Sequence, residues 1–110
     1  MAKFLFLMFG LPGQPNAGDD ETQAYNHKWR AYMGSLAHRG ALESGAPLEP
    51  TAKAVTSGSV SDAQLGSPDL YGYMVVNAAS LDDAIAIARD APHMALGGIT
   101  IVRPCVEIPR

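Results

Sequence analysis

The segment Lys-Phe-Leu-Phe-Leu-Met-Phe-Gly, Lys3 to Gly10, decides the fold of this chain. It is too short for a stable helix before the breakers Gly10 and Pro12, so we interpret it as a strand. A strand with one face in water alternates apolar and polar residues, but this one is apolar on both sides. Met74 to Val76 and Ile99 to Val102 share the pattern. Together these segments predict a sheet that is dry on both faces.

The first helix is predicted between Asp19 and Gly40. Asp19 and Asp20 suit the start of a helix, and Gly40 supplies the left-handed residue that ends one. The apolar positions between them recur at spacings of three and four and form a single stripe. They are Tyr25, Trp29, Tyr32, Met33 and Leu36.

The second helix is predicted to begin after Ser80, because Asp83 three residues later gives a pattern like a capping box. Pro92 is expected to end this helix at Ala91. Leu70 to Asn77 precedes the helix and is rich in aromatic and β-branched residues, which indicates a strand. Ile99 to Val102 follows the helix as the last core strand, and the residues from 106 to 108 are a candidate extension of it.

Between the helices lie two weaker strand candidates, Ala41 to Leu48 and Thr51 to Thr56. Pro47 and Pro50 separate them, an order that suits a hairpin at the edge of a sheet. Ser57 to Asp69 is rich in Ser, Gly and Asp and is predicted to be a surface loop.

The complete order is strand, helix, strand, strand, helix, strand. For residues 1–110 it predicts one α+β domain, a ferredoxin-like βαββαβ antiparallel sheet with two helices on one face. Two helices can cover only one side of the sheet, so the second dry face is expected to pack on another copy in a homodimer. A parallel sheet between helices would need more helices than the chain has. The composition agrees, because only 17% of the residues are charged while 47% are hydrophobic.

The charge and the length of the apolar runs exclude several classes of partner. The net charge is −3 and the cations are scattered, so nucleic acid is not expected to bind. The apolar runs are too short to cross a bilayer, so no membrane association is expected, and Phe4 to Phe9 is short for a secretory signal. Cys105 is the only cysteine and fits a reducing compartment. We therefore predict a cytoplasmic protein.

Several short motifs follow one another along nearly the whole chain. They are Lys3 to Phe6, the Trp29 helix running into Gly40, Pro47-Leu48-Glu49-Pro50, Gly72-Tyr73, Ala79 to Ala84, Ala91-Pro92-His93-Met94, Gly97-Gly98 and Val102-Arg103-Pro104. Taken together and in order, these motifs resemble the YCII-related proteins, which include the group named for an Asp-Gly-Pro-Phe signature. The resemblance implies a ferredoxin-like protomer paired into a dimeric α/β barrel.

The resemblance also implies a chemistry, because some members of this family are small lyases or dehydrochlorinase-like enzymes that use a histidine on the first helix. Counted back from Gly40, that position is Trp29 here, and an indole cannot exchange protons near neutral pH. His27 lies about 200° around the helix from it, at roughly 100° per residue. The signature tetrapeptide is replaced by Asp62-Ala63-Gln64-Leu65, which keeps only its aspartate.

Two residues are candidate proton carriers. His93 follows a helix and precedes Gly97-Gly98, and loops of this kind often border a cleft. Its simpler interpretation is a histidine that bonds backbone carbonyls at a helix end. Asp62 is a candidate base if its loop folds over a pocket, and otherwise a solvated turn residue.

Four further residues are candidate ligand contacts. Trp29 and Tyr32 would line a pocket for an aromatic or lactone-like molecule, or else belong to the core. Tyr73 has a hydroxyl that suits either role. Arg103 is expected to hold an anionic ligand or, preferably, a carboxylate of the partner chain.

No cofactor and no metal site are predicted. His27 and His38 lie about 16 Å apart along a helix and cannot share an ion, and no Cys or His pair has zinc spacing. The loop from Gly10 to Gly18 lacks the phosphate-binding fingerprints.

Two hypotheses on function follow, with a regulatory or interaction module as a third. The first is a homodimeric protein that binds a small organic molecule without catalysis. The second is a small lyase or isomerase that acts on an organic acid or lactone through His93 and Asp62.

Overall fold

The computed structural model describes residues 2–10, 20–49, 51–63 and 70–108. The main sheet has the strand order β2-β5-β1-β6, and all neighbouring strands are antiparallel. Its strands are β1 (Ala2–Phe9), β2 (Leu42–Pro47), β5 (Leu70–Ala78) and β6 (Ile99–Pro104). The helices are α1 (Asp20–His38), α2 (Leu81–Arg89) and the short 3-10 helix η1 (Pro92–Leu96).

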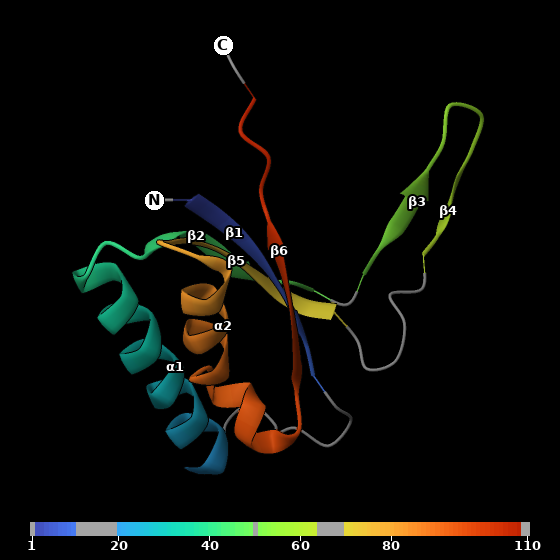
Figure 1. Cartoon of the computed structure of the whole chain (residues 1–110). Helices are drawn as coiled ribbons and strands as arrows, with labels where there is room; N and C mark the ends of the chain where they lie inside the picture. The colour runs from blue at the N-terminus through green and yellow to red at the C-terminus, as the bar shows by residue number, and fades with distance from the viewer. Residues whose placement is uncertain (1, 11–19, 50, 64–69, 109–110) are drawn as a thin grey trace.

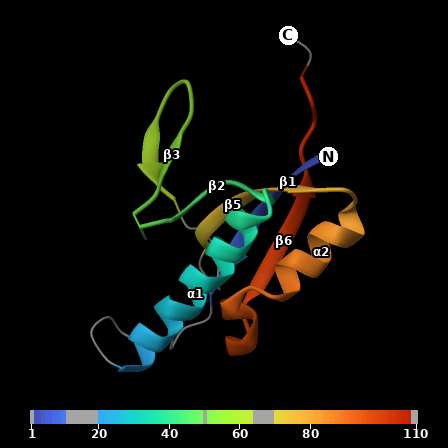
Figure 2. The same cartoon turned by 90° about the vertical axis from the view of Figure 1, so that its left-hand side faces the viewer.

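Figures 1 and 2 show both α-helices on one side of this sheet. With the strand order and the antiparallel pairing, this arrangement is the ferredoxin-like α+β fold that the order of elements predicts.

The core lies between the sheet and the helices. Phe4, Phe6 and Met8 alternate along β1 and are buried on the helix side, as the period of two requires. Met74 and Val76 continue this layer on β5, opposite Phe6 and Phe4. On the helix side, this layer is covered by Leu36 of α1 and by Ala84, Ile87 and Ala88 of α2.

The predicted helix signals are largely confirmed. The Ser80 hydroxyl accepts a hydrogen bond from the backbone N–H of Asp83 at 3.1 Å, and Gly40 has the left-handed φ of 74°. Asp19, the other predicted cap, lies outside the described residues. The end of α2 was predicted two residues too late, because Pro92 opens the separate helix η1 instead of ending α2 directly. Among the residues described, no helix is long and apolar enough to cross a membrane.

The second face of the sheet carries apolar side chains and none of the helices described above. Across it, Leu7 of β1 lies opposite both Tyr73 of β5 and Ile101 of β6, and Phe9 lies opposite Ile99. Ile99 and Ile101 are 47% and 45% exposed. The expectation of strands that are apolar on both sides is therefore confirmed, and we call this surface the open face.

The predicted edge hairpin is wrong in its pairing. Leu42–Pro47 pairs with β5 inside the main sheet, whereas β3 (Lys53–Val55) pairs with β4 (Val60–Asp62) in a separate two-stranded ribbon. Residues 60–62 were predicted to be loop, because three residues with polar neighbours give no detectable strand signal. The end of that predicted loop, residues 64–69, lies outside the described residues.

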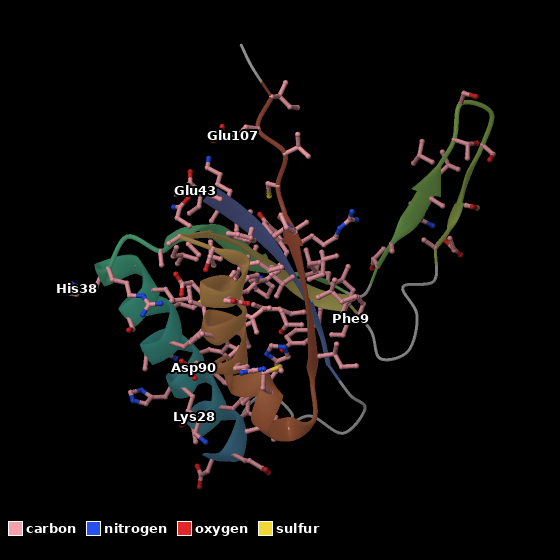
Figure 3. The ribbon with its side chains drawn as sticks, in the orientation of Figure 1. Phe9, Lys28, His38, Glu43, Asp90 and Glu107 are labelled. Atoms are coloured by element: carbon pink, nitrogen blue, oxygen red, sulfur yellow. The ribbon has the colours of Figure 1, made fainter. Side chains whose placement is uncertain are left out.

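The last strand also ends earlier than its candidate extension. Regular pairing stops at Pro104, after which the backbone N–H of Cys105 donates to the carbonyl of Lys3 at 2.9 Å. Val106 and Ile108 are 86% and 83% exposed on a segment that leaves the body of the domain. Glu107 lies on the same segment, well away from the helices (Figure 3).

Candidate functional site

His93 is the most deeply buried titratable residue that the structure describes, with no exposed surface. It lies in η1, which Gly97 ends with a left-handed φ of 82°. The next residue, Gly98, packs on the imidazole, and a Cβ there would lie 2.5 Å from Cδ2 of His93. The two glycines therefore have different tasks, since one turns the backbone and the other leaves room for the ring.

The hydrogen bonds of His93 define its tautomer. Nε2 lies 2.8 Å from Oγ1 of Thr100 and 3.3 Å from the carbonyl oxygen of Ile99. Oγ1 of Thr100 in turn donates to Sδ of Met94 at 3.7 Å. The Ile99 carbonyl can only accept, and the Thr100 hydrogen is directed to sulfur. All three contacts are satisfied together only if Nε2 carries the imidazole hydrogen.

In this tautomer, Nδ1 of His93 is an unprotonated hydrogen-bond acceptor. It is buried and has no hydrogen-bond partner among the described residues. Burial lowers the pKa of His93, and the hydrogen bond to the Ile99 carbonyl offsets part of this effect. The side chain is therefore neutral at pH 7, and Nδ1 is available as an acceptor or a base.

Aromatic rings from α1 and β5 surround the imidazole. The ring of Trp29 stacks on His93 with centroids 5.5 Å apart and planes inclined by 17°. Tyr71 meets His93 edge-on at 5.8 Å, and Tyr25 and Tyr32 meet Trp29 edge-on at 6.3 and 5.7 Å. We call these five residues the aromatic cluster.

Tyr71 joins this cluster because the pairing of β1 and β5 is irregular. Met8 lies opposite Gly72 and Phe9 opposite Leu70, so Tyr71 is the extra residue of a β-bulge. The bulge lets its side chain pack against the core on the helix side, next to His93. A regular strand would place Tyr71 on the same face as Tyr73.

The tyrosine hydroxyls of α1 differ in their surroundings. The hydroxyl of Tyr32 donates to the carbonyl of Ile87 at 2.8 Å, and burial raises the pKa of this tyrosine well above its usual value. This bond ties α1 to α2. The hydroxyl oxygen of Tyr25 is also buried but has no partner among the described residues. A hydroxyl on Tyr25 and an acceptor on His93 thus lie on rings that both contact Trp29.

Of the predicted site residues, the structure brings together His93, Trp29 and Tyr32. Tyr73 and Arg103 lie on the open face, where their strand positions are opposite Leu7 and Leu5. Asp62 lies on the ribbon, is exposed, and pairs with Lys53. Within one chain, Asp62 and His93 therefore do not belong to the same site.

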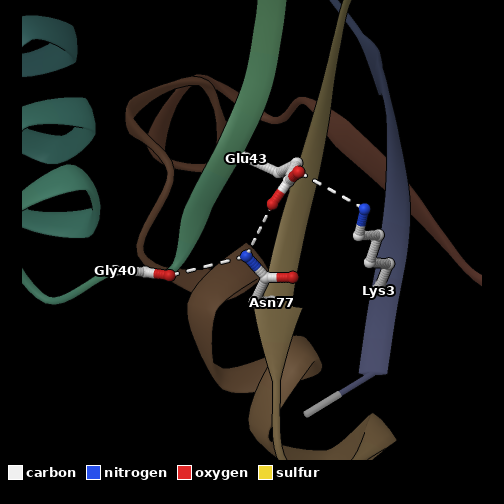
Figure 4. Close-up of polar contacts among 4 residues, drawn as sticks. All are labelled: Lys3, Gly40, Glu43 and Asn77. Carbon is white, nitrogen blue, oxygen red and sulfur yellow. Dashed lines mark hydrogen bonds and ion pairs between the residues drawn. The ribbon is translucent and has the colours of Figure 1, made fainter.

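Three polar side chains form a network at one end of the open face. Glu43 accepts hydrogen bonds from Nζ of Lys3 at 3.3 Å and from the side-chain amide of Asn77 at 3.0 Å (Figure 4). These bonds, led by that of Asn77, lower the pKa of Glu43. The Asn77 amide also lies 3.5 Å from the carbonyl of Gly40.

The described residues contain no cluster of three His, Cys, Asp or Glu side chains able to hold a metal ion. His27 and His38 are exposed on α1, and Cys105 is exposed beyond β6. Sequence reasoning identified His93 but did not place Tyr71 beside it, and it assigned Tyr25 only to the apolar stripe of the first helix. The signal for Tyr71 was the pair of aromatic residues separated by Gly72, which fits a bulge.

The strand order, the antiparallel pairing and the helices on one side define an α+β domain of the ferredoxin-like class. No protein-family profile matches the sequence, and no curated protein does. Among solved structures, the chain is similar to 5-chloro-2-hydroxyhydroquinone dehydrochlorinase from Burkholderia phenoliruptrix, in complex with 2,5-dihydroxybenzoquinone. The TM-score is 0.52 at 18% identity, over 92% of this chain and 90% of that enzyme. This likeness concerns the fold.

We expect the pKa of His93 in the folded protein to lie below its ordinary value of 6.5, because the ring is buried. At a pH between the pKa of His93 in the folded chain and its higher pKa in the unfolded chain, only the unfolded chain binds the proton. The free energy of unfolding therefore rises with pH between these two pKa values. Acidification below 6.5 should therefore destabilise the fold. NMR titration of the His93 ring protons measures the pKa, and urea unfolding at several pH values measures the stability. A His93 pKa at or above 6.5 would contradict the burial argument.

Proposed function

We propose that this chain forms a homodimer of the YCII-related kind that binds a small organic molecule at the aromatic cluster. One observation carries the proposal: Nδ1 of His93 and the hydroxyl of Tyr25 are buried without a partner among the described residues. A buried polar atom left unpaired costs about 1–3 kcal/mol, so it calls for an occupant. Both atoms belong to rings that contact Trp29, which gives an occupant an apolar surface as well.

The hydrogen-bonding groups of the cluster restrict the chemical class of the ligand. An O–H donor satisfies Nδ1, and a second oxygen accepts from the Tyr25 hydroxyl. The pKa of His93 is set by burial and a backbone carbonyl, so no charged side chain favours a strongly ionised ligand there. A planar ring that carries hydroxyl or carbonyl oxygens fits these requirements. Because His93 is fully buried, such a ligand reaches Nδ1 only by displacing neighbouring side chains.

The homodimer is proposed from the open face. Its apolar residues include Leu7 and Ile101, and the two α-helices pack on the opposite side of the sheet. A second open face matches it in size and apolar character, since an obligate dimer interface resembles a divided core. Tyr73 and Arg103 lie on this face, and we assign them to contacts with the partner.

Ile101→Lys is expected to weaken the dimer, because each partner would then bury a charge on an apolar surface. Sedimentation equilibrium should show the dissociation constant rising by at least about tenfold, which corresponds to roughly 1.4 kcal/mol. Leu81→Lys is the matched control, since Leu81 is 44% exposed on α2 and Ile101 is 45% exposed on the open face. A wild-type chain that sediments as a monomer at all concentrations overturns the homodimer.

Titration with hydroquinone tests the ligand site, because this planar ring is neutral at pH 7 and carries both O–H donors and acceptor oxygens. We expect saturable heat by calorimetry, and His93→Phe should weaken binding by about tenfold because one buried hydrogen bond is lost. His38→Phe is the control, because His38 is the exposed last residue of α1 (Figure 3). Equal affinities for the two variants would remove His93 from the site.

A second candidate function is a lyase or isomerase that acts on a small organic acid, lactone or hydroxylated ring. It is favoured by the neutral imidazole with its unprotonated Nδ1, and by the fold likeness to a dehydrochlorinase. On a hydroxylated ring that carries chlorine, Asp62 from the partner chain would move a hydroxyl proton to the ring carbon that bears chlorine. Nδ1 of His93 would then accept a second hydroxyl proton as the C–Cl bond breaks, so that the ring becomes a quinone and HCl is lost overall.

Chloride release from 5-chloro-2-hydroxyhydroquinone tests this candidate. Turnover by the wild type should fall by about 10²–10⁴-fold in His93→Gln, the usual contribution of a general base. Asp62→Asn should lower it as well, whereas His38→Gln should leave it unchanged. Ligand binding without chloride release would favour a binding protein over this enzyme.

A further inference from the structure

The β3–β4 ribbon does not bury its own surface. Each strand has three residues, and every residue from 53 to 62 is exposed. Val55 and Val60, at the end of the ribbon next to its turn, are 72% and 66% exposed. A two-stranded hairpin alone is marginally stable in water, so this one needs a surface to pack on.

The two faces of the ribbon are different. Val55 lies directly opposite Val60, and Lys53 lies opposite Asp62 with their side chains paired. Because side chains alternate along a strand, these two pairs share one face, whereas Ala54 and Ser61 take the other. One face therefore combines an apolar patch near the turn with an ion pair at the base, the pattern of a small contact surface.

The ribbon extends away from the body of the domain on the side of the sheet opposite the helices, as Figures 1 and 2 both show. The radius of gyration is 15.4 Å, whereas a compact domain of this length has about 13 Å. The ribbon thus projects past the open face. A partner that covers the open face would lie on this same side of the sheet.

We propose that the ribbon is a docking arm that packs its Val55–Val60 face on a second copy of this chain. The inference rests on the proposed homodimer, because the arm borders the same face through which the two copies would meet. A second copy is the favoured occupant because its own open face presents the exposed apolar residues Ile99 and Ile101 beside Leu7. In a two-fold dimer each arm would extend over the other protomer, and the exposed Asp62 would be carried toward the partner.

The double variant Val55→Ser/Val60→Ser tests the arm. Sedimentation equilibrium should show the dimer dissociation constant rising by at least about tenfold, because two apolar side chains per arm lose their contacts. Ala54→Ser, on the other face of the same strand, is the control and should leave the constant unchanged. The NMR signals of the His93 ring should be the same in all three proteins, which shows that the domain itself remains folded.

A photo-reactive phenylalanine at Val60 gives a second measurement in cells that express the chain. We expect a covalent product of two copies, with the attachment site mapped by mass spectrometry to the partner. A product with a different protein, or attachment within the same chain, overturns the docking arm.

The two proposals fail in different ways. If Ile101→Lys separates the dimer while Val55→Ser/Val60→Ser leaves the constant unchanged, the arm is wrong and the homodimer stands. If the wild type is a monomer at every concentration, both proposals fall.

Discussion

The structure depends on one constraint, which is that β1 is apolar on both sides while the described helices cover only one of them. Antiparallel pairing with β5 and β6 places Phe4, Phe6 and Met8 under the helices and turns Leu5, Leu7 and Phe9 to the other side. The helix side encloses the buried histidine and its aromatic neighbours, and the other side provides the apolar surface from which we infer a partner. The site and the proposed assembly thus occupy opposite faces of the same strands.

The sequence predicted those parts of the fold that depend on local chemistry. Ser80 and Gly40 act within a few residues of their own positions, so their capping roles could be recognised from the neighbouring residues alone. The pairing of Thr51 to Thr56 could not be recognised in this way. The choice between the predicted partner Ala41 to Leu48 and the observed partner β4 is made by the geometry of the whole sheet. The bulge at Tyr71 was also missed, since it depends on the register against Met8 and Phe9.

The candidate site shows the same division. His93 shortly before Gly97-Gly98 was a recognisable feature of the sequence. Its stacking partner Trp29 comes from a helix far away in the sequence. Only the fold shows that the indole of Trp29 contacts an imidazole from another part of the chain. The ion pair of Asp62 with Lys53 likewise needed the ribbon, whose first strand lies within the predicted strand Thr51 to Thr56 but whose second strand no sequence pattern indicated.

Trp29 is the only tryptophan of the chain, and it lies face to face with His93. Tryptophan fluorescence therefore originates at a single place, beside the imidazole of His93. Protonation of this imidazole, or a ligand bound to it, would change the surroundings of the indole. The protein contains its own optical probe at the candidate site, and no dye or inserted label is needed to follow what enters there.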